Sequence, residues 1–376
     1  MRLLHRASSW RQLFAEDALP DPRAWPALLT PLKGALLSLG SQPTLAEAKA
    51  WQPMLVDALI RLDIPAWRIS QLLGDHNAWL YRCAINLSLE EMQATGWGDP
   101  PVAFCVLTLG SVARHECLLG PDQDNAMILA EYSDAEHDTI DSYFQSLGYR
   151  FGERLHEAGI PRCHAHVMAR WPMWRKRLSE WRKQLDIWTA QRRVKRVQQA
   201  NILFDFAPVY GDSALARELR EHIVWRVPSA HLFLGEMRDL LDETPVALGR
   251  LGRLMGDGKD APHRGVIDLK RQGLIPLQNA VRLLAVANGC SSGDTRGRLT
   301  ELVALQKMGA ARAMALKEAL DRLQERLLKT QMDSLAQGRA PDYWVNVSAL
   351  SSAERLLLRH DLQQIKGLLA QASRAD

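Results

Sequence analysis

Hydrophobic residues recur at helical spacing over much of the chain and predict helices at both of its ends. In the first ~75 residues prolines interrupt short apolar stretches, and Leu55, Leu59 and Leu62 fall on one helical face. A further helix is predicted from Asn77 to about Met92. The N-terminal part is therefore predicted to consist of helices, the first of them short and separated by prolines.

The pattern changes after the loop Gly96–Pro101. Residues 102–109 form a continuous, partly β-branched apolar run that stops at Gly110, which is typical of a strand buried on both faces. Two more strands are predicted, from Asp122 to Leu129 and from Asn201 to Phe206, with helices between them. This middle part is therefore predicted to mix α and β structure.

Beyond Pro228 the apolar spacing again indicates helices, and no further strand is predicted. Apolar residues in the stretch Leu277–Leu284 lie on one helical face. Ser351 and Glu354 have the spacing of a capping box and predict the start of a last helix. The predicted fold is α+β, with an α/β centre between two all-helical parts.

Composition narrows the class of protein. The chain has 376 residues, 47% of them hydrophobic and 24% charged, which excludes disordered, collagen-like and coiled-coil proteins and predicts roughly two or three domains. A net charge of +4 is too small to indicate nucleic-acid binding, because such domains carry strong, clustered positive charge. No run of about 18 apolar residues predicts a membrane span.

Compartment is predicted from two further features. The basic N-terminus lacks the apolar stretch of roughly 7–15 residues that a secretory signal has. The five cysteines are few and scattered, and they form neither a disulfide framework nor a CxxC zinc pair. A cytoplasmic protein is expected.

One constellation suggests chemistry. Gly110 and Ser111 follow the buried strand, and Asp122 and Asp124 open the next one. Side chains alternate along a strand, so both carboxylates can reach one site, and paired carboxylates suit Mg²⁺ with phosphate oxygens. A Gly-Ser turn after a strand offers backbone N–H groups and a hydroxyl to a phosphate. These parts together indicate nucleotidyl transfer, in which two metal ions hold the triphosphate and activate the attacking oxygen.

The spacing alone leaves an alternative open, in which Asp122 and Asp124 are surface acids at a strand start. A longer stretch distinguishes the two. Gly110–Ala126 resembles the Gly-Ser-x-Gly-Arg-x-Glu and Asp-Gln-Asp-Asn-Ala motif of the signal-transduction nucleotidyltransferases, a bacterial family that often carries CBS and cyclic-nucleotide-binding domains. That family is similar to the uridylyltransferase that modifies the nitrogen regulator PII, within the polymerase-β-like nucleotidyltransferase fold.

The resemblance extends over about residues 78–370. It continues through Gly159–Cys163 and Phe204–Asp212, and Ile267–Leu277 is similar to the family's substrate-binding domain. It implies an N-terminal helical region at 1–77, a nucleotidyltransferase domain with a small mixed sheet at 78–222, and a helical substrate-binding domain at 228–376.

The resemblance also implies roles for six residues. Asp122 and Asp124 would be metal ligands, and Asp205 a third carboxylate that binds metal or acts as a base. The triphosphate would be held by Gly110, Ser111 and Arg114. Three positions depart from the family pattern and put substrate choice and rate in doubt more than metal binding: Ala113, Pro121 and Ala207.

The expected reaction is Mg²⁺-dependent transfer of NMP from an NTP, and the resemblance points to a protein acceptor. Two alternatives remain: transfer to RNA or a small molecule, and a nucleotide-sensing signalling module with little turnover. The three retained carboxylates count against the sensing module, whereas Ala113 and Ala207 count mildly for it. Neither the acceptor nor the oligomeric state follows from the sequence.

Three other features allow two interpretations each. Cys163–His166 could bind metal, but no partner pair exists, and a loop with a partly buried cysteine is favoured. The basic segment Arg170–Arg196 could bind nucleic acid, but its tryptophans repeat every seven residues, which favours one long amphipathic helix with the indoles packed inward. Lys270 and Arg282 are interpreted as surface charges, with a substrate contact as the alternative.

Overall fold

The computed structural model describes residue 14 and residues 30–40, 42–190, 194–243, 245–256, 258 and 260–374. The chain forms two compact units. The first comprises Met1–Lys183 and Asp205–Leu219, and the second comprises Gln184–Phe204 and Arg220–Asp376. The chain therefore leaves the first unit at Lys183 and re-enters it at Asp205.

The first unit begins with helices, as the sequence predicts. They are α2 (Thr30–Leu39), α3 (Leu45–Ala50), α4 (Gln52–Arg61) and α5 (Ala66–Ala94). Pro53 lies in the first turn of α4, and Pro65 is the N-cap of α5. The helix predicted from Asn77 begins eleven positions earlier, because buried polar side chains such as Arg68 and Ser70 interrupt its apolar pattern.

A four-stranded sheet forms the centre of the first unit, in the order β3-β2-β1-β4. Its strands are β1 (Phe104–Leu109), β2 (Asn125–Leu129), β3 (Arg175–Arg177) and β4 (Phe206–Gly211). β1 is antiparallel to both β2 and β4, and β2 is parallel to β3. Every residue of β1 and β2 is buried, which confirms the predicted strand at 102–109 and the α+β class.

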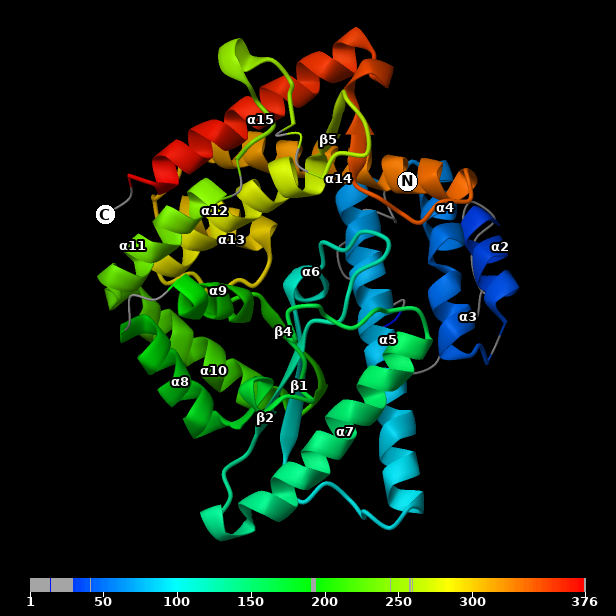
Figure 1. Cartoon of the computed structure of the whole chain (residues 1–376), viewed down its shortest axis with the longest axis vertical. Helices are drawn as coiled ribbons and strands as arrows, with labels where there is room; N and C mark the ends of the chain where they lie inside the picture. Colours follow the sequence, from blue (N-terminus) through cyan, green and yellow to red (C-terminus); the bar gives the residue numbers. More distant parts are fainter. Residues whose placement is uncertain are drawn as a thin grey trace. The chain divides into compact units, whose positions relative to one another are not determined.

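Helices cover the sheet of the first unit. The four-residue α6 (Gly110–Ala113) follows β1 directly. α7 (His137–Glu157) packs against the long α5, and the two helices run beside the strands (Figure 1). α8 (Leu178–Ala190) and α10 (Ser213–Arg226) contain the points where the chain passes between the units.

The prediction of a strand at Asn201–Phe206 is wrong. Residues 201–203 are the last turn of α9 (Val194–Leu203), and β4 starts only at Phe206. The Phe204 N–H still donates to the Ala200 carbonyl at 3.0 Å, as in a helix. A short apolar run is compatible with either a helix or a strand, and this one is helical. Asp205 therefore lies between a helix and a strand, and strand alternation does not determine its direction.

The prediction of a single helix over Arg170–Arg196 is also wrong. A 3₁₀ turn at Pro172–Trp174 and strand β3 precede α8, and Arg175 is held by a two-pronged ion pair with Asp141, both distances 2.9 Å. The inward packing of the tryptophans is confirmed, since Trp174, Trp181 and Trp188 are all buried. Arg192 and Arg193 lie outside the described residues.

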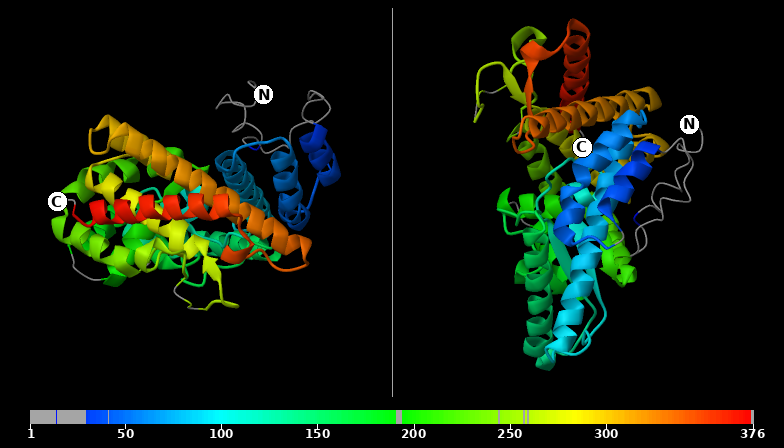
Figure 2. Two further views of the ribbon diagram at one scale, coloured as in Figure 1. Left: turned by 90° about the horizontal axis from the view of Figure 1, so that it is seen from above. Right: turned by 90° about the vertical axis from the view of Figure 1, so that its right-hand side faces the viewer.

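The second unit is mainly helical. After α9, its helices are α11 (His231–Asp239), α12 (Ile275–Ala287), α13 (Thr295–Ala304), α14 (Ala310–Ala336) and α15 (Ser352–Ala372). The predicted capping box is confirmed, because Ser351 and Glu354 bond to each other's backbone N–H at the start of α15. The long helices α14 and α15 pack against each other, orange and red in Figure 2.

The prediction of no strand after Pro228 is wrong. β5 (Val266–Asp268) and β6 (Trp344–Asn346) form a small antiparallel sheet. Strands of three residues separated by about 75 positions leave no periodic signal, and tertiary contacts must stabilise such a two-stranded sheet. None of the helices that the structure describes is both long and apolar enough to cross a bilayer.

Gly211 at the end of β4 is a sensitive position for stability. Its φ is +83°, and a Cβ built there would overlap the carbonyl oxygen of Phe104 on β1. We expect Gly211→Ala to lower the free energy of unfolding by about 3 kcal/mol, from left-handed backbone strain plus overpacking. Gly98→Ala is the matched control, since Gly98 has φ +73° with no atom near its Cβ. Urea unfolding that shows equal losses would contradict the proposed overlap.

Candidate active site

Asp122 and Asp124 flank a buried glutamine in the extended segment before β2. The Gln123 side chain is fully buried and donates hydrogen bonds to the carbonyls of Gly152 and Ile160, both at 2.9 Å. Its backbone N–H donates to the Pro161 carbonyl at 2.8 Å. Since side chains alternate along an extended segment, anchoring Gln123 inward directs both aspartates to the opposite side.

The two carboxylates meet there, together with a thiol. Ligand atoms of Asp122, Asp124 and Cys163 all lie within 4.8 Å of one another. Burial and the neighbouring Asp124 carboxylate raise the pKa of the Cys163 thiol to about 12, so the thiol stays protonated and donates to Asp124. The sequence interpretation missed this role of Cys163. Neither His164 nor His166 joins a ligand cluster among the described residues.

The turn after β1 lies directly against Asp124. The Leu109 N–H donates to the Asp124 carbonyl at 2.9 Å, and Gly110 adopts a φ of +62°. A Cβ at Gly110 would lie 3.2 Å from Oδ2 of Asp124, so glycine here leaves room for the carboxylate. The Gly110 N–H donates to the Asp205 carbonyl at 3.0 Å. It is therefore not available to a phosphate, contrary to the expectation from the sequence.

Arg114 and Asp205 bind each other. Nη1 of Arg114 lies 2.5 Å from Oδ2 of Asp205, and its Nε lies 3.1 Å from Oε2 of Glu116. All three side chains are buried. Burial by itself would lower the pKa of the Arg114 guanidinium, but the two carboxylates outweigh it and raise that pKa above its ordinary value. Asp205 stands outside the cluster of Asp122, Asp124 and Cys163.

Asn125 connects the acidic segment to two other parts of the first unit. Its Oδ1 accepts from the Ala169 N–H at 2.8 Å, and its Nδ2 donates to the Tyr81 hydroxyl on α5 at 3.4 Å. In the run Asp-Gln-Asp-Asn, the amides therefore hold the backbone in place while the carboxylates stay accessible. Asp122 is exposed and Asp124 half-buried.

A polar chain from the N-terminal helices reaches the Gly-Ser turn. Lys49 on α3 donates to Gln52 at 2.5 Å, and Gln52 donates to Asn77 on α5 at 2.9 Å. The Cys117 thiol forms a hydrogen bond with the Asn77 side chain, and its sulfur atom lies 4.0 Å from the hydroxyl oxygen of Ser111. Burial lowers the pKa of Lys49 to about 8. No spacing in the sequence indicated these residues, because their elements meet only in the folded chain.

Lys270 and Arg282 belong to the second unit, and each engages neighbours there. The Lys270 ammonium lies 4.3 Å from the centre of the Tyr343 ring and 3.2 Å from its hydroxyl. Arg282 is buried and donates to the side-chain oxygens of Asn201 and Asn279. The interpretation of Arg282 as a surface charge is therefore wrong.

Comparison with protein families yields two matches. Residues 51–195 match a family model described as "Putative nucleotidyltransferase DUF294". Residues 231–375 match one described as "Putative nucleotidyltransferase substrate binding domain". The first match contains the Gly110 turn, Asp122 and Asp124, whereas Asp205 lies between the two. No curated protein matched the sequence.

Arg114 should be important for stability. In Arg114→Met the buried carboxylates of Asp205 and Glu116 lose the guanidinium that pairs with both of them, and breaking such a buried network typically costs about 3–5 kcal/mol. We expect a fall of that size in the free energy of unfolding, measured by urea denaturation. Arg61→Met is the control, because Arg61 pairs with Asp57 on the exposed surface of α4 and should change stability little. A similar small effect at both positions would contradict the structural role of Arg114.

Proposed function

We propose that the chain catalyses Mg²⁺-dependent transfer of NMP from an NTP to an acceptor, the kind of reaction that its two family matches describe. One observation carries this proposal: the paired carboxylates of Asp122 and Asp124 lie against the turn that follows β1. The acidic pair, the adjacent glycine and the family match, whose region contains them, support the same chemistry.

The donor set fits magnesium. Mg²⁺ prefers a small number of carboxylate oxygens together with phosphate oxygens, and Asp122 and Asp124 would supply the protein's share. The third group of the cluster, the Cys163 thiol, is a soft sulfur ligand of the kind that Mg²⁺ does not prefer. When bound, the metal ions supply charge neutralisation at the triphosphate and activation of the attacking oxygen.

In the proposed reaction an acceptor oxygen forms a bond to the α-phosphorus while the bond to the bridging oxygen of pyrophosphate breaks. The acceptor proton has to leave, and Asp205 is the proposed third carboxylate that receives it or binds metal. Its backbone is tied to Gly110 beside Asp124. Because Asp205 and Arg114 are paired, Asp205 can act only after this ion pair opens, and the same opening would let Arg114 approach the triphosphate beside Ser111.

The acceptor is proposed to be a protein. The motif resemblance to the PII uridylyltransferase supports this choice, with the catalytic domain at 78–222, the helical domain at 228–376 holding the acceptor, and the helical region 1–77 preceding them. The second candidate is a cytoplasmic nucleotide-sensing module with little turnover, which the closed Arg114–Asp205 ion pair favours.

The metal site is tested first. We expect Asp122→Asn and Asp124→Asn each to abolish NMP transfer, because either change removes half of the negative charge that holds the cation pair. The measurement is incorporation of α-labelled NTP into lysate protein, RNA or small molecules, with Mg²⁺ and with EDTA. Asp99→Asn, at an exposed loop acid, should label like the unchanged protein. Undiminished labelling in both site variants would disprove the site, and no label from any NTP would favour the sensing module.

Asp205 is tested separately from metal binding. If it accepts the proton, Asp205→Asn should lower turnover by about 10²–10⁴-fold, the usual contribution of a general base. Binding of Mg²⁺-NTP, assigned mainly to Asp122 and Asp124, should change little. Nucleotide affinity and turnover are to be measured in the same preparation. Turnover at the level of the unchanged protein would make Asp205 purely a structural partner of Arg114.

A further inference from the structure

Two arginines of the second unit bind the same backbone carbonyl, that of Phe204. Nη1 of Arg220 on α10 donates to this oxygen at 2.8 Å, and Nη2 of Arg298 on α13 donates to it at 3.0 Å. A carbonyl oxygen has two lone pairs, and hydrogen bonds from a guanidinium are stronger than those between neutral groups. The Phe204 oxygen therefore accepts two charge-assisted hydrogen bonds, which fix its direction.

The guanidinium of Arg298 is itself well supported. It is buried, and its Nε donates to the Ser292 carbonyl at 3.0 Å. The loop that carries Ser292 is bound by Glu301 on α13, whose carboxylate accepts from the N–H groups of Ser291 at 2.7 Å and Ser292 at 3.1 Å. The side chain of Asp294 caps the start of the same helix. Arg298 is thus held in one place when it binds Phe204.

The bound carbonyl belongs to the peptide unit that enters Asp205. Because a peptide unit is planar, the direction of the Phe204 oxygen also sets the positions of the nitrogen and Cα of Asp205. The peptide unit that leaves Asp205 is fixed as well, since its carbonyl accepts from the Gly110 N–H at 3.0 Å. The nitrogen, Cα and carbonyl carbon of a residue determine where its Cβ points. Both peptide units next to Asp205 are therefore held, and the direction of its side chain follows from them.

The two peptide units are held by different parts of the chain. Phe204, Arg220 and Arg298 belong to the second unit, whereas Gly110 and Asp205 belong to the first. Strand alternation does not direct Asp205, because the residue lies between α9 and β4. Hydrogen bonds from the second unit supply half of the restraint that a strand would otherwise give.

We propose that Arg220 and Arg298 are positioning residues for the transfer reaction, because they hold the Phe204 carbonyl and so direct the Asp205 carboxylate. This inference rests on the proposed function, in which Asp205 receives the acceptor proton or binds metal. When the ion pair of Arg114 with Asp205 opens, the side chain moves while the backbone on both sides of it stays in place. The carboxylate then has one direction toward the acceptor oxygen.

A purely structural role is the alternative, because Phe204 directly follows the last residue of α9. Basic side chains near a helix C-terminus bind the last carbonyls and interact favourably with the helix dipole. A cap of this kind would stabilise the second unit whether or not Asp205 is present. The two roles therefore differ in whether the arginines act through Asp205.

The first test measures turnover and nucleotide affinity in the full chain. Arg220→Met should lower turnover by about 10–100-fold, as small misplacements of a reacting group do. The dissociation constant of Mg²⁺-NTP should change by less than about 2-fold, because that binding is assigned to Asp122 and Asp124. In the Asp205→Asn background the same change should lower turnover by less than about 2-fold, since two residues that act through one group are not additive.

Two further variants complete the set. Arg217→Met is the matched control, because Arg217 is an exposed arginine on the same helix α10, and it should leave turnover unchanged. Arg298→Lys keeps the charge but loses the guanidinium fork, and it should act like Arg220→Met. If this buried position does not tolerate the change, which circular dichroism would show, Arg220→Met at a half-buried position still tests the inference.

Hydrogen exchange gives a second readout that needs no catalysis. The Gly110 N–H is protected by its bond to the Asp205 carbonyl. If the arginines position Asp205, Arg220→Met should speed the exchange of this amide by about 10-fold or more, because local opening becomes easier. The Gln123 N–H, which is bonded to a different carbonyl in the first unit, is the control amide and should not change.

Two results would overturn the inference when the unchanged protein transfers NMP. One is an equal loss of turnover with and without the Asp205 carboxylate, which would make the arginines a helix cap. The other is unchanged turnover in both Arg220→Met and Arg298→Lys. If the unchanged protein transfers no NMP, the proposed function fails by itself and hydrogen exchange decides: faster exchange at Gly110 supports the positioning of Asp205, and unchanged exchange overturns it.

Discussion

The structure around the candidate active site depends on the contact that returns the chain to the first unit at Asp205. Two bonds make it: the Gly110 N–H donates to the Asp205 carbonyl, and Arg114 pairs with the Asp205 side chain. Because a buried carboxylate without a cation is very costly, this arrangement requires Arg114, and Glu116 then balances the remaining guanidinium edge. This contact joins the start of β4 to the turn after β1, and Asp124 lies beside that turn.

A second constraint operates within the run Asp122–Asn125. Gln123 and Asn125 are buried, and their side chains form hydrogen bonds with neighbouring segments. The alternate residues, Asp122 and Asp124, face the site. Two carboxylates held close together repel each other, and a backbone anchored on both sides can hold them there without a cation. Rigid support of this kind is what a metal-binding pair requires.

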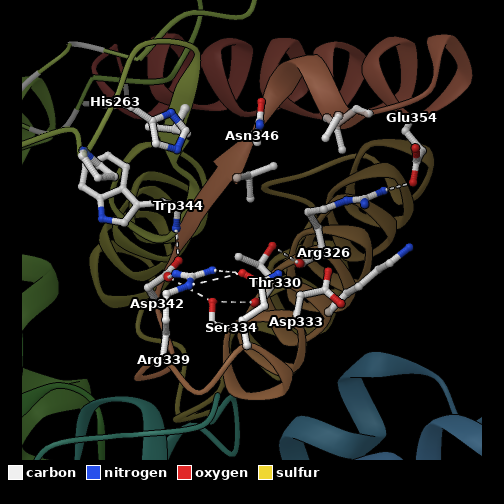
Figure 3. Close-up of a pocket in the computed structure, with 17 residues that line it drawn as sticks. His263, Arg326, Thr330, Asp333, Ser334, Arg339, Asp342, Trp344, Asn346 and Glu354 are labelled. Carbon is white, nitrogen blue, oxygen red and sulfur yellow. Dashed lines mark hydrogen bonds and ion pairs between the residues drawn. The ribbon is translucent and has the colours of Figure 1, made fainter.

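In the second unit, charged side chains lie both in the interior and around a cavity. This unit too buries charged side chains, Arg298 and Asp361 among them. Other charges are paired at the wall of one cavity, where Arg326 of α14 pairs with Glu354 of α15 and Arg339 pairs with Asp342 in the loop before β6 (Figure 3). The small sheet of β5 and β6 supplies Trp344 to that wall. The region that matches a family model described as a substrate-binding domain thus contains a polar cavity lined by residues from elements far apart in the sequence.

Local patterns in the sequence were enough to predict the buried strand at 102–109, the capping box at Ser351, the inward tryptophans and the shared side of Asp122 and Asp124. Each depends on side-chain periodicity or on groups within four residues of one another. The sequence did not reveal that Asn201–Leu203 is helical, that β5 pairs with β6, or that Cys163 and Lys49 lie near the site. Those features depend on contacts between segments that are distant in the sequence. Such contacts can override local propensity, and they produce no periodic pattern of residues in the sequence.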